Sequence, residues 1–287
     1  MAVVPWVFVL LWSTGFIGAR LVVGEADPLA ILTVRFALAS LCALVIVAAT
    51  RTRFSMERRM VGHVAVVGLL LHGVYLGSVF WSIADGLPAG ISALIAGLQP
   101  IVTACIVGPV LGERVGRLQW LGFALGLLGI GLVLWERLTI GGVTTGAVLV
   151  GFLALAGITC GALYQKRFCT GVPIWPGAVI QYAAATALVG AGALLFESAP
   201  RIEWTPKVIG GLIYMVFVLS IGAVSLLMLV IRRMSAARTA SLLYLTPPLA
   251  ALEAYLVFGE TLNALAIAGL LIAALGVFLV VRGDPAT

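Results

Sequence analysis

The sequence has very little charge. Of its 287 residues, 10% are charged and 62% are hydrophobic, and the mean hydropathy is +1.20. A soluble domain is nearer a quarter charged, so this chain has too few charged side chains to cover a surface that faces water. The composition excludes an ordinary soluble globular protein and indicates an integral membrane protein.

Cysteines and catalytic motifs are also scarce. The four cysteines show no CxxC spacing, so we interpret them as packing residues and expect neither a disulfide nor a metal site. The sequence has no GxxxxGK[ST] loop and no HExxH motif, and we expect no cofactor. ATP-driven transport by this chain alone and membrane-embedded catalysis are therefore both disfavoured.

The net charge of +6 comes from basic residues in short loops between apolar runs. This distribution is typical of membrane topology signals and argues against nucleic-acid binding. No basic segment precedes the first apolar run, because Arg20 follows it. We therefore expect a retained first span and no cleaved signal peptide.

Ten apolar runs are long enough to cross the hydrocarbon core of a bilayer, which takes about 20 residues as a helix. They predict an all-α polytopic membrane protein with ten transmembrane helices. The expected spans are residues 4–23, 29–49, 61–84, 87–110, 117–135, 143–164, 176–197, 207–230, 238–258 and 263–281.

Lys and Arg residues predict the orientation. With a cytoplasmic N-terminus, twelve of them fall on the inner side and four on the outer side, as the positive-inside rule requires. We expect a multi-pass protein of the bacterial inner (plasma) membrane with both termini in the cytoplasm. The oligomeric state, monomer or homodimer, stays open.

One stretch of the sequence occurs twice. Residues 89–113 and 236–260 align without a gap at an offset of 147 residues, and each copy has a proline near its middle and ends in Gly-Glu. The offset is about half of the chain, which predicts two five-helix repeats, 1–140 and 141–287. Because five is odd, the second repeat must be inverted in the membrane, as in many secondary transporters.

The repeated prolines predict broken helices. Pro100, Pro247 and Pro248 cannot donate a backbone hydrogen bond, so each leaves a carbonyl that must face protein, water or a ligand. Gln99 lies beside the first break, and Ser241 lies about two turns before the second. These positions indicate a cavity at mid-depth; a packing kink that a neighbouring helix satisfies is the alternative.

Two charged residues lie well inside expected spans, away from the span ends. Arg35 and Glu253 lie at similar depths below the outer surface, and each would be costly alone in the membrane. We expect a structural or gating role and hypothesise an Arg35–Glu253 ion pair. The alternatives are that Arg35 reaches the headgroups and that Glu253 faces water.

The third span carries His72 and Tyr75 on one helical face. An ionisable group at mid-span is a functional candidate, and histidine titrates near neutral pH. A neutral histidine bonded to a neighbouring helix is the alternative. Tyr244 aligns with Gly97, so the second repeat adds a ring where the first leaves space.

The sequence resembles EamA-type members of the drug/metabolite transporter superfamily. The resemblance rests on Trp12-Ser13-Thr14-Gly15-Phe16, on Arg35-Phe36, and on the proline helices that end in Gly112-Glu113 and Gly259-Glu260. It is greatest to bacterial amino-acid exporters of the YddG type. It implies a basket of two inverted halves, a central cavity, alternating access and export of amino acids or related metabolites.

These observations together predict a secondary transporter for a small-molecule substrate, embedded in the lipid bilayer. Cationic drugs are the alternative solute class, and a membrane-embedded enzyme or a structural subunit is the alternative of a different kind. The expected substrate-binding residues are His72, Tyr75, Gln99, Ser241, Tyr244, Trp12, Ser13, Thr14, Trp81 and Tyr164.

Overall fold

The computed structural model describes residues 3–112, 115–138, 144–197, 199–235, 239, 242, 245–258 and 264–282. Within these ranges the chain is helical and has no strand, only isolated bridges that join Ala26 to Val23 and to Ile202. The expected all-α class is confirmed. The expected residues Ser241 and Tyr244 lie outside the described residues.

Six described helices are long and apolar enough to cross a membrane, and each matches an expected span within a few residues. Two of them contain an internal π-helical segment. Their bounds are Val4–Val22 (α1), Pro28–Ala49 (α2), Arg58–Gly68, Leu69–Val74 and Tyr75–Ala84 (α3, η1 and α4), Thr145–Phe168 (α8), Ile174–Phe196 (α9), and Pro206–Tyr214, Met215–Ala223 and Val224–Arg233 (α10, η2 and α11).

Shorter or partly described helices lie in the regions of the four other expected spans. They are Ala89–Gly97 (α5), Gln99–Leu111 (α6), Arg117–Leu138 (α7), Thr246–Phe258 (α13) and Ala264–Arg282 (α14). Gly112, directly after α6, has a φ of 71°. Glycine adopts this left-handed conformation without strain and ends helices for that reason.

The repeat extends beyond the stretch in which the sequence shows it. The starts of α6 and α13 (99 and 246) and of α7 and α14 (117 and 264) are separated by the same offset as the repeated stretch. The starts of α2 and α9 (28 and 174) and of η1 and η2 (69 and 215) are separated by one position less. The two π-helical segments therefore occupy matching places in the two halves.

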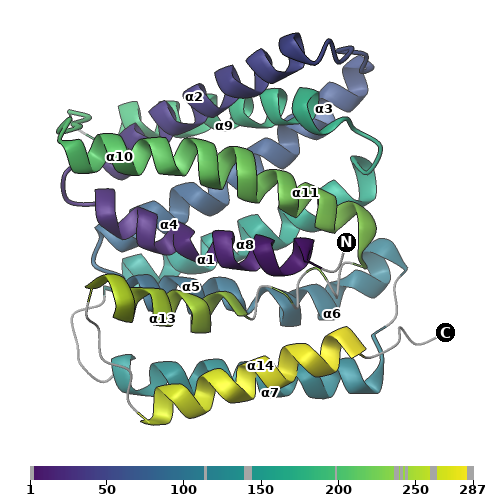
Figure 1. The fold of residues 1–287 in the computed structure, drawn as a ribbon, viewed down its shortest axis with the longest axis vertical. Helices are drawn as coiled ribbons and strands as arrows, with labels where there is room; N and C mark the ends of the chain where they lie inside the picture. Colours follow the sequence, from purple (N-terminus) through teal and green to yellow (C-terminus); the bar gives the residue numbers. More distant parts are fainter. Residues whose placement is uncertain are drawn as a thin grey trace.

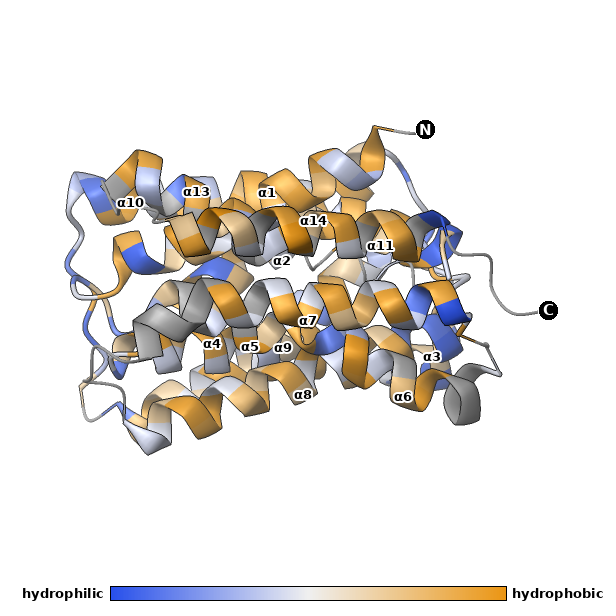
Figure 2. Ribbon diagram, turned by 90° about the horizontal axis from the view of Figure 1, so that it is seen from below, coloured by the Kyte–Doolittle hydropathy of each residue, from blue (hydrophilic) through white to orange (hydrophobic). Residues whose placement is uncertain are grey.

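The helices form a bundle with one helix pair at each edge. In Figure 1, α2 and α9 lie together at one edge and α7 and α14 at the other, with the remaining helices between them. In Figure 2, hydrophobic residues cover the middle of the helices and hydrophilic residues gather at both ends of the bundle. Large apolar side chains such as Leu194 and Leu271 are exposed, as a lipid-facing surface allows.

The α7–α14 pair is held by close backbone contact. A Cβ atom at Gly276 would lie 2.6 Å from the Gly122 carbonyl oxygen, and one at Gly122 would lie 2.6 Å from that of Gly276. Small residues let helices in lipid approach this closely. The repeat offset of 147 residues relates Gly122 to Gly269 and Gly129 to Gly276, so two of the repeated glycines form this helix–helix contact.

Each π-helical segment packs against the first helix of the other half. Gly18 of α1 faces η2, where its Cβ position is 3.6 Å from Met215 Cγ. Gly157 and Gly161 of α8 face η1, with Cβ positions 2.8 Å from the Tyr75 nitrogen and 2.7 Å from Leu71 Cγ. The Gly157-to-Gly161 segment is a GxxxG pattern, which suits close helix packing.

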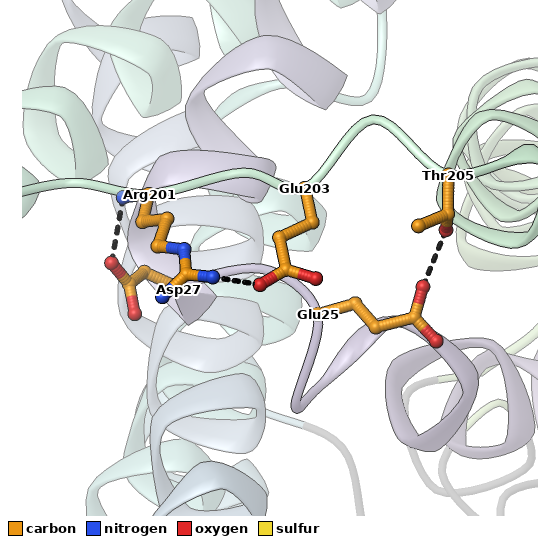
Figure 3. A network of polar contacts seen from close by, with 5 residues as sticks. All are labelled: Glu25, Asp27, Arg201, Glu203 and Thr205. Carbon is orange, nitrogen blue, oxygen red and sulfur yellow. Dashed lines mark hydrogen bonds and ion pairs between the residues drawn. The ribbon is translucent and has the colours of Figure 1, made fainter.

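The loops 23–27 and 199–205 are joined at one end of the bundle, which we call the Asp27 end (Figure 3). The Asp27 amide donates to the Arg201 carbonyl (2.9 Å), and the Arg201 amide donates to Asp27 Oδ2 (2.7 Å). The side chains of Thr205 and Lys207 donate to the Glu25 carboxylate. Two segments far apart in sequence are therefore tied to each other here.

Contacts near these loops shift the pKa values of two glutamates. The Lys207 ammonium and the Thr205 hydroxyl hold the pKa of Glu25 below its ordinary value. Glu197, at the end of α9, accepts the free amides of Leu29 (2.7 Å) and Ala30 (3.0 Å), so it caps the start of α2. Burial nevertheless raises the pKa of the Glu197 carboxyl.

Candidate functional site

A cavity lies among helices of both halves. Most of its described wall is apolar or aromatic, and Arg35 is the charged residue among the described residues that line it. It is lined by Trp12, Gly15 and Phe16 of α1, Arg35 of α2, Tyr75, Leu76, Val79 and Phe80 of α4, and Leu219, Ala223 and Val224 of η2 and α11.

Arg35 is 3% exposed, although it carries a full charge. Its Nε donates to the Ser220 hydroxyl at 3.0 Å, and its guanidinium lies 5.6 Å from the centre of the Phe36 ring. Ser220 is positioned by η2, and π-helical turns are frequent at functional sites. The Tyr182 hydroxyl donates to the Ser220 carbonyl and so holds this residue from the other side.

Trp12 and Tyr75 form the aromatic part of the cavity wall. Their rings are nearly parallel, with centroids 6.2 Å apart and an interplanar angle of 8°. Tyr75 is almost fully buried directly after η1, and Gly157 lets α8 pack against the backbone at this point. The sequence predicts that both residues contact substrate, and the structure brings them together in one cavity.

His72 does not line this cavity. Its ring lies behind the wall, 4.7 Å from the Tyr182 ring centroid and 5.9 Å from that of Phe36. Its Nε2 faces Gln181 Oε1 at 3.3 Å, and Gln181 donates in turn to Gln165. The alternative interpretation, a histidine bonded to a neighbouring helix, fits this position, although His72 Nδ1 has no partner within the described chain.

The expected Arg35–Glu253 ion pair is not formed. Arg35 bonds to Ser220, whereas Glu253 accepts a hydrogen bond from the Ser13 hydroxyl at 2.6 Å. Matching depth in two helices did not bring the two side chains together, because depth says nothing about which helices are neighbours. Glu253 instead ties α13 to α1.

Several predicted residues have partners away from the cavity. The Thr14 hydroxyl lies 2.5 Å from the Tyr214 hydroxyl. Trp81 packs edge-on against Phe196 at the Asp27 end. The Tyr164 hydroxyl lies 2.7 Å from His63 Nδ1 at the opposite end of α8.

The proline breaks lie beside a second, smaller cavity. Leu98 separates α5 from α6, and α6 and α13 both begin one residue before a repeated proline. The side chains of Pro100 and Pro248 are buried; Pro247 lies in α13. The cavity is lined by Gln99, Thr103, Ala162, Leu163, Lys166, Ile231 and Thr239.

Buried oxygen atoms without partners gather around these breaks. The repeat pairs Ser92 with Thr239 and Gln99 with Thr246, and in all four a buried side-chain oxygen has no hydrogen-bond partner in the described protein. Unsatisfied buried polar atoms are costly. Because the repeat relates these four positions in pairs, a polar path between the broken helices explains them better than four unrelated packing defects.

Sequence reasoning missed Ser220, Tyr182 and Gln181. A signal for one was present, because the offset of 146 residues between α2 and α9 carries Arg35 onto Gln181. Serine in an apolar run is common in membrane helices and gave no signal for Ser220. No group of His, Cys, Asp and Glu that could hold a metal ion occurs in the part of the chain that the structure describes.

The geometry is that of a membrane protein with a buried, mostly apolar cavity between two repeated halves. The model of the EamA-like transporter family matches the sequence twice, at residues 4–135 and 145–282. The chain belongs to the EamA-like transporter family. It is therefore a membrane transporter, and the resemblance inferred from its motifs is confirmed.

Curated relatives within this family are similar over most of their length. The uncharacterized inner membrane transporter YedA of Escherichia coli (strain K12) is 28% identical over 256 residues, which cover 88% of this chain and 81% of YedA. A probable amino-acid metabolite efflux pump of Salmonella typhimurium (strain LT2) is 23% identical over 285 residues, 96% and 92% of the two chains. These names describe the relatives.

A solved crystal structure has the same fold as this EamA-like chain. The two superpose with a TM-score of 0.78 over 96% of this chain and 94% of the other. They are 18% identical, so this likeness bears on the fold alone.

Proposed function

We propose that this chain is a secondary transporter that exports amino acids or related small metabolites across the bacterial inner membrane by alternating access. The observation that carries the proposal is the cavity between the two halves, which lies near the middle of α1 and has Arg35 and aromatic rings in its wall. Both halves of the chain contribute to its wall, so a relative movement of the halves would change its access. The relative named as an amino-acid metabolite efflux pump supports the solute class.

The proposed membrane arrangement has ten spans in two inverted repeats, 1–140 and 141–287, with both termini in the cytoplasm. The nearly constant offset between matching helices and the two family matches support the division. The excess of Lys and Arg in the expected inner loops supports the orientation. The Asp27 end, with its joined loops, then faces outward.

Cationic drugs are less well suited to the cavity. Arg35 is the charged residue in the described part of its wall and repels a cation at short range. Glu253, the carboxylate that a cationic solute needs, does not belong to this wall and is bonded to Ser13. The family assignment also favours transport over a membrane-embedded enzyme or a structural subunit.

Transport by the purified protein in sealed liposomes tests the proposal. We expect labelled phenylalanine or leucine to cross the bilayer faster than in protein-free liposomes. Trp12→Ala removes part of the cavity wall and should reduce the flux, whereas Trp81→Ala, which changes a contact with Phe196 outside the cavity, should leave it near the wild-type rate. Absence of flux for every amino acid tested would refute the proposed function.

A further inference from the structure

The guanidinium of Arg35 is buried in the cavity wall without an anionic partner among the described residues. Within that part of the chain, its one hydrogen bond runs from Nε to Ser220 and uses neither terminal nitrogen. The ion pairs that join Arg201 to Glu203 and Lys207 to Glu25 do not involve Arg35. A buried cation of this kind is costly unless an anion is supplied.

Two carboxylates of the described chain contact other groups. Glu253 Oε1 accepts from Ser13 while its Oε2 has no partner among the described residues, and Glu197 is bonded to the two amides that begin α2. The titratable side chains that interact with Arg35 are those of Tyr75, Tyr182 and His72, and none of them is a carboxylate. The Arg35 guanidinium therefore lies in the cavity wall without a counter-ion from the described protein. A bound solute could provide that anion.

The rest of the cavity wall is suited to an apolar body. Trp12 and Tyr75 present large rings, and Val79 and Leu219 add aliphatic surface. The described wall contains no carboxylate that could bind an ammonium group. The described wall can therefore bind the anionic end of an amphiphilic solute through charge, but not a cationic end.

We propose that Arg35 is the receptor for the carboxylate of the transported solute, and that the solute class is amphiphilic monocarboxylates with or without an α-amino group. The two terminal nitrogens bind the carboxylate as a fork, a geometry that arginine provides and lysine does not. Ser220 fixes the guanidinium through Nε, and Trp12 and Tyr75 cover the apolar part. This inference rests on the proposed function, because only that proposal says that the bound solute is transported.

Binding of three probes to the purified wild-type protein in detergent tests the solute class without any mutation. The probes are phenylalanine, phenylalaninamide and 3-phenylpropanoate, each titrated by isothermal calorimetry. We expect 3-phenylpropanoate to bind about as tightly as phenylalanine and the amide at least about tenfold more weakly, because the amide cannot form the charged fork. Equal binding of the amide, or no binding of either acid, would overturn the proposal.

Variants at Arg35 test the receptor itself. Arg35→Gln should weaken 3-phenylpropanoate at least about tenfold and bring the acid-to-amide affinity ratio close to one. Arg35→Lys keeps the charge without the fork and should fall between the two. Arg117→Gln, at the exposed start of α7, is the matched control and should bind as the wild type does. Unchanged discrimination in a folded Arg35→Lys or Arg35→Gln protein would also refute the assignment.

Liposome flux separates this inference from the proposed function. Arg35-dependent binding of carboxylates without any flux would leave the receptor assignment standing and refute the transport proposal. Flux of phenylalanine and its amide at equal rates would support transport and refute the receptor assignment.

Discussion

Arg35 Nε lies 3.0 Å from the Ser220 hydroxyl, so a helix of the first half and a π-helical segment of the second meet in one hydrogen bond at the cavity wall. The Tyr182 hydroxyl donates to the carbonyl of the same serine. Ser220 is therefore in contact with Arg35 of the first half and with Tyr182 of the second half.

Ser220→Ala should loosen the guanidinium without removing its charge. Because hydrogen bonds to charged groups contribute about 1.5–3 kcal/mol, we expect 3-phenylpropanoate to bind about tenfold more weakly. Calorimetry measures the change. Ser82→Ala is the control, since the Ser82 hydroxyl bonds only to a carbonyl of its own helix. Equal effects of the two substitutions would mean that Ser220 has no special role at Arg35.

Gln99→Leu should separate a functional from a structural role at the proline break. The Gln99 Oε1 atom is buried without a partner in the described chain, so an apolar side chain of similar size should leave the unfolding temperature unchanged or raise it, while lowering flux. Gln119→Leu is the matched control: Gln119 is equally buried, but its Oε1 accepts the Gly116 amide at 2.9 Å, so this change should lower stability. A large stability loss in Gln99→Leu would contradict the prediction.

Gly157→Ala should destabilise the contact between α8 and η1. The new methyl group would lie 2.8 Å from the Tyr75 nitrogen and 3.1 Å from the Leu70 carbonyl, and backbone atoms cannot move aside cheaply. Overpacking of this kind costs about 1–3 kcal/mol. Gly131→Ala, which meets open space, should be neutral or stabilising. Thermal unfolding of both variants in the same detergent makes the comparison, and equal unfolding temperatures would refute it.

The Glu25 contacts should weaken in acid. Lys207 and Thr205 lower the folded-state pKa of Glu25 below its value in the unfolded chain, which is about 4.3. Its stabilising contribution is therefore present above that pH and disappears as the pH falls through the folded-state pKa. The difference in unfolding temperature between the wild type and Glu25→Gln should be larger at about pH 7 than at about pH 3.5. A difference that is the same at both pH values would show that ionised Glu25 contributes nothing.

A disulfide across the Asp27 end should trap the conformation described here. Ala26 and Ile202 form an antiparallel bridge, so cysteines at both positions are close enough to be oxidised. If the cavity opens on this side during transport, the cross-linked double variant should lose flux and regain it after reduction. The single variants Ala26→Cys and Ile202→Cys are the controls. Full flux in the cross-linked protein would mean that these loops stay joined throughout the cycle.

The sequence by itself determined the membrane class, the helices and the repeat, because these depend on composition and on local periodicity. Residues without polar side chains must be buried in lipid or protein wherever they lie, and the repeated stretch needs no structure to be seen. The aromatic residues Trp12 and Tyr75 were also found, since large rings in apolar runs are conspicuous. The packing role of the Gly157-to-Gly161 segment, in contrast, needed the position of η1.

Only the tertiary structure decided which helices are neighbours and hence which polar groups meet. In the structure, Arg35 bonds to Ser220, Glu253 accepts from Ser13, and His72 lies behind the cavity wall beside Gln181. Depth along a helix is fixed by the chain, but rotation about the helix axis and the choice of neighbour follow from packing across the whole bundle. The sequence shows an arginine within an apolar run. Only the structure shows that no described carboxylate pairs with it, because that depends on where the surrounding side chains lie.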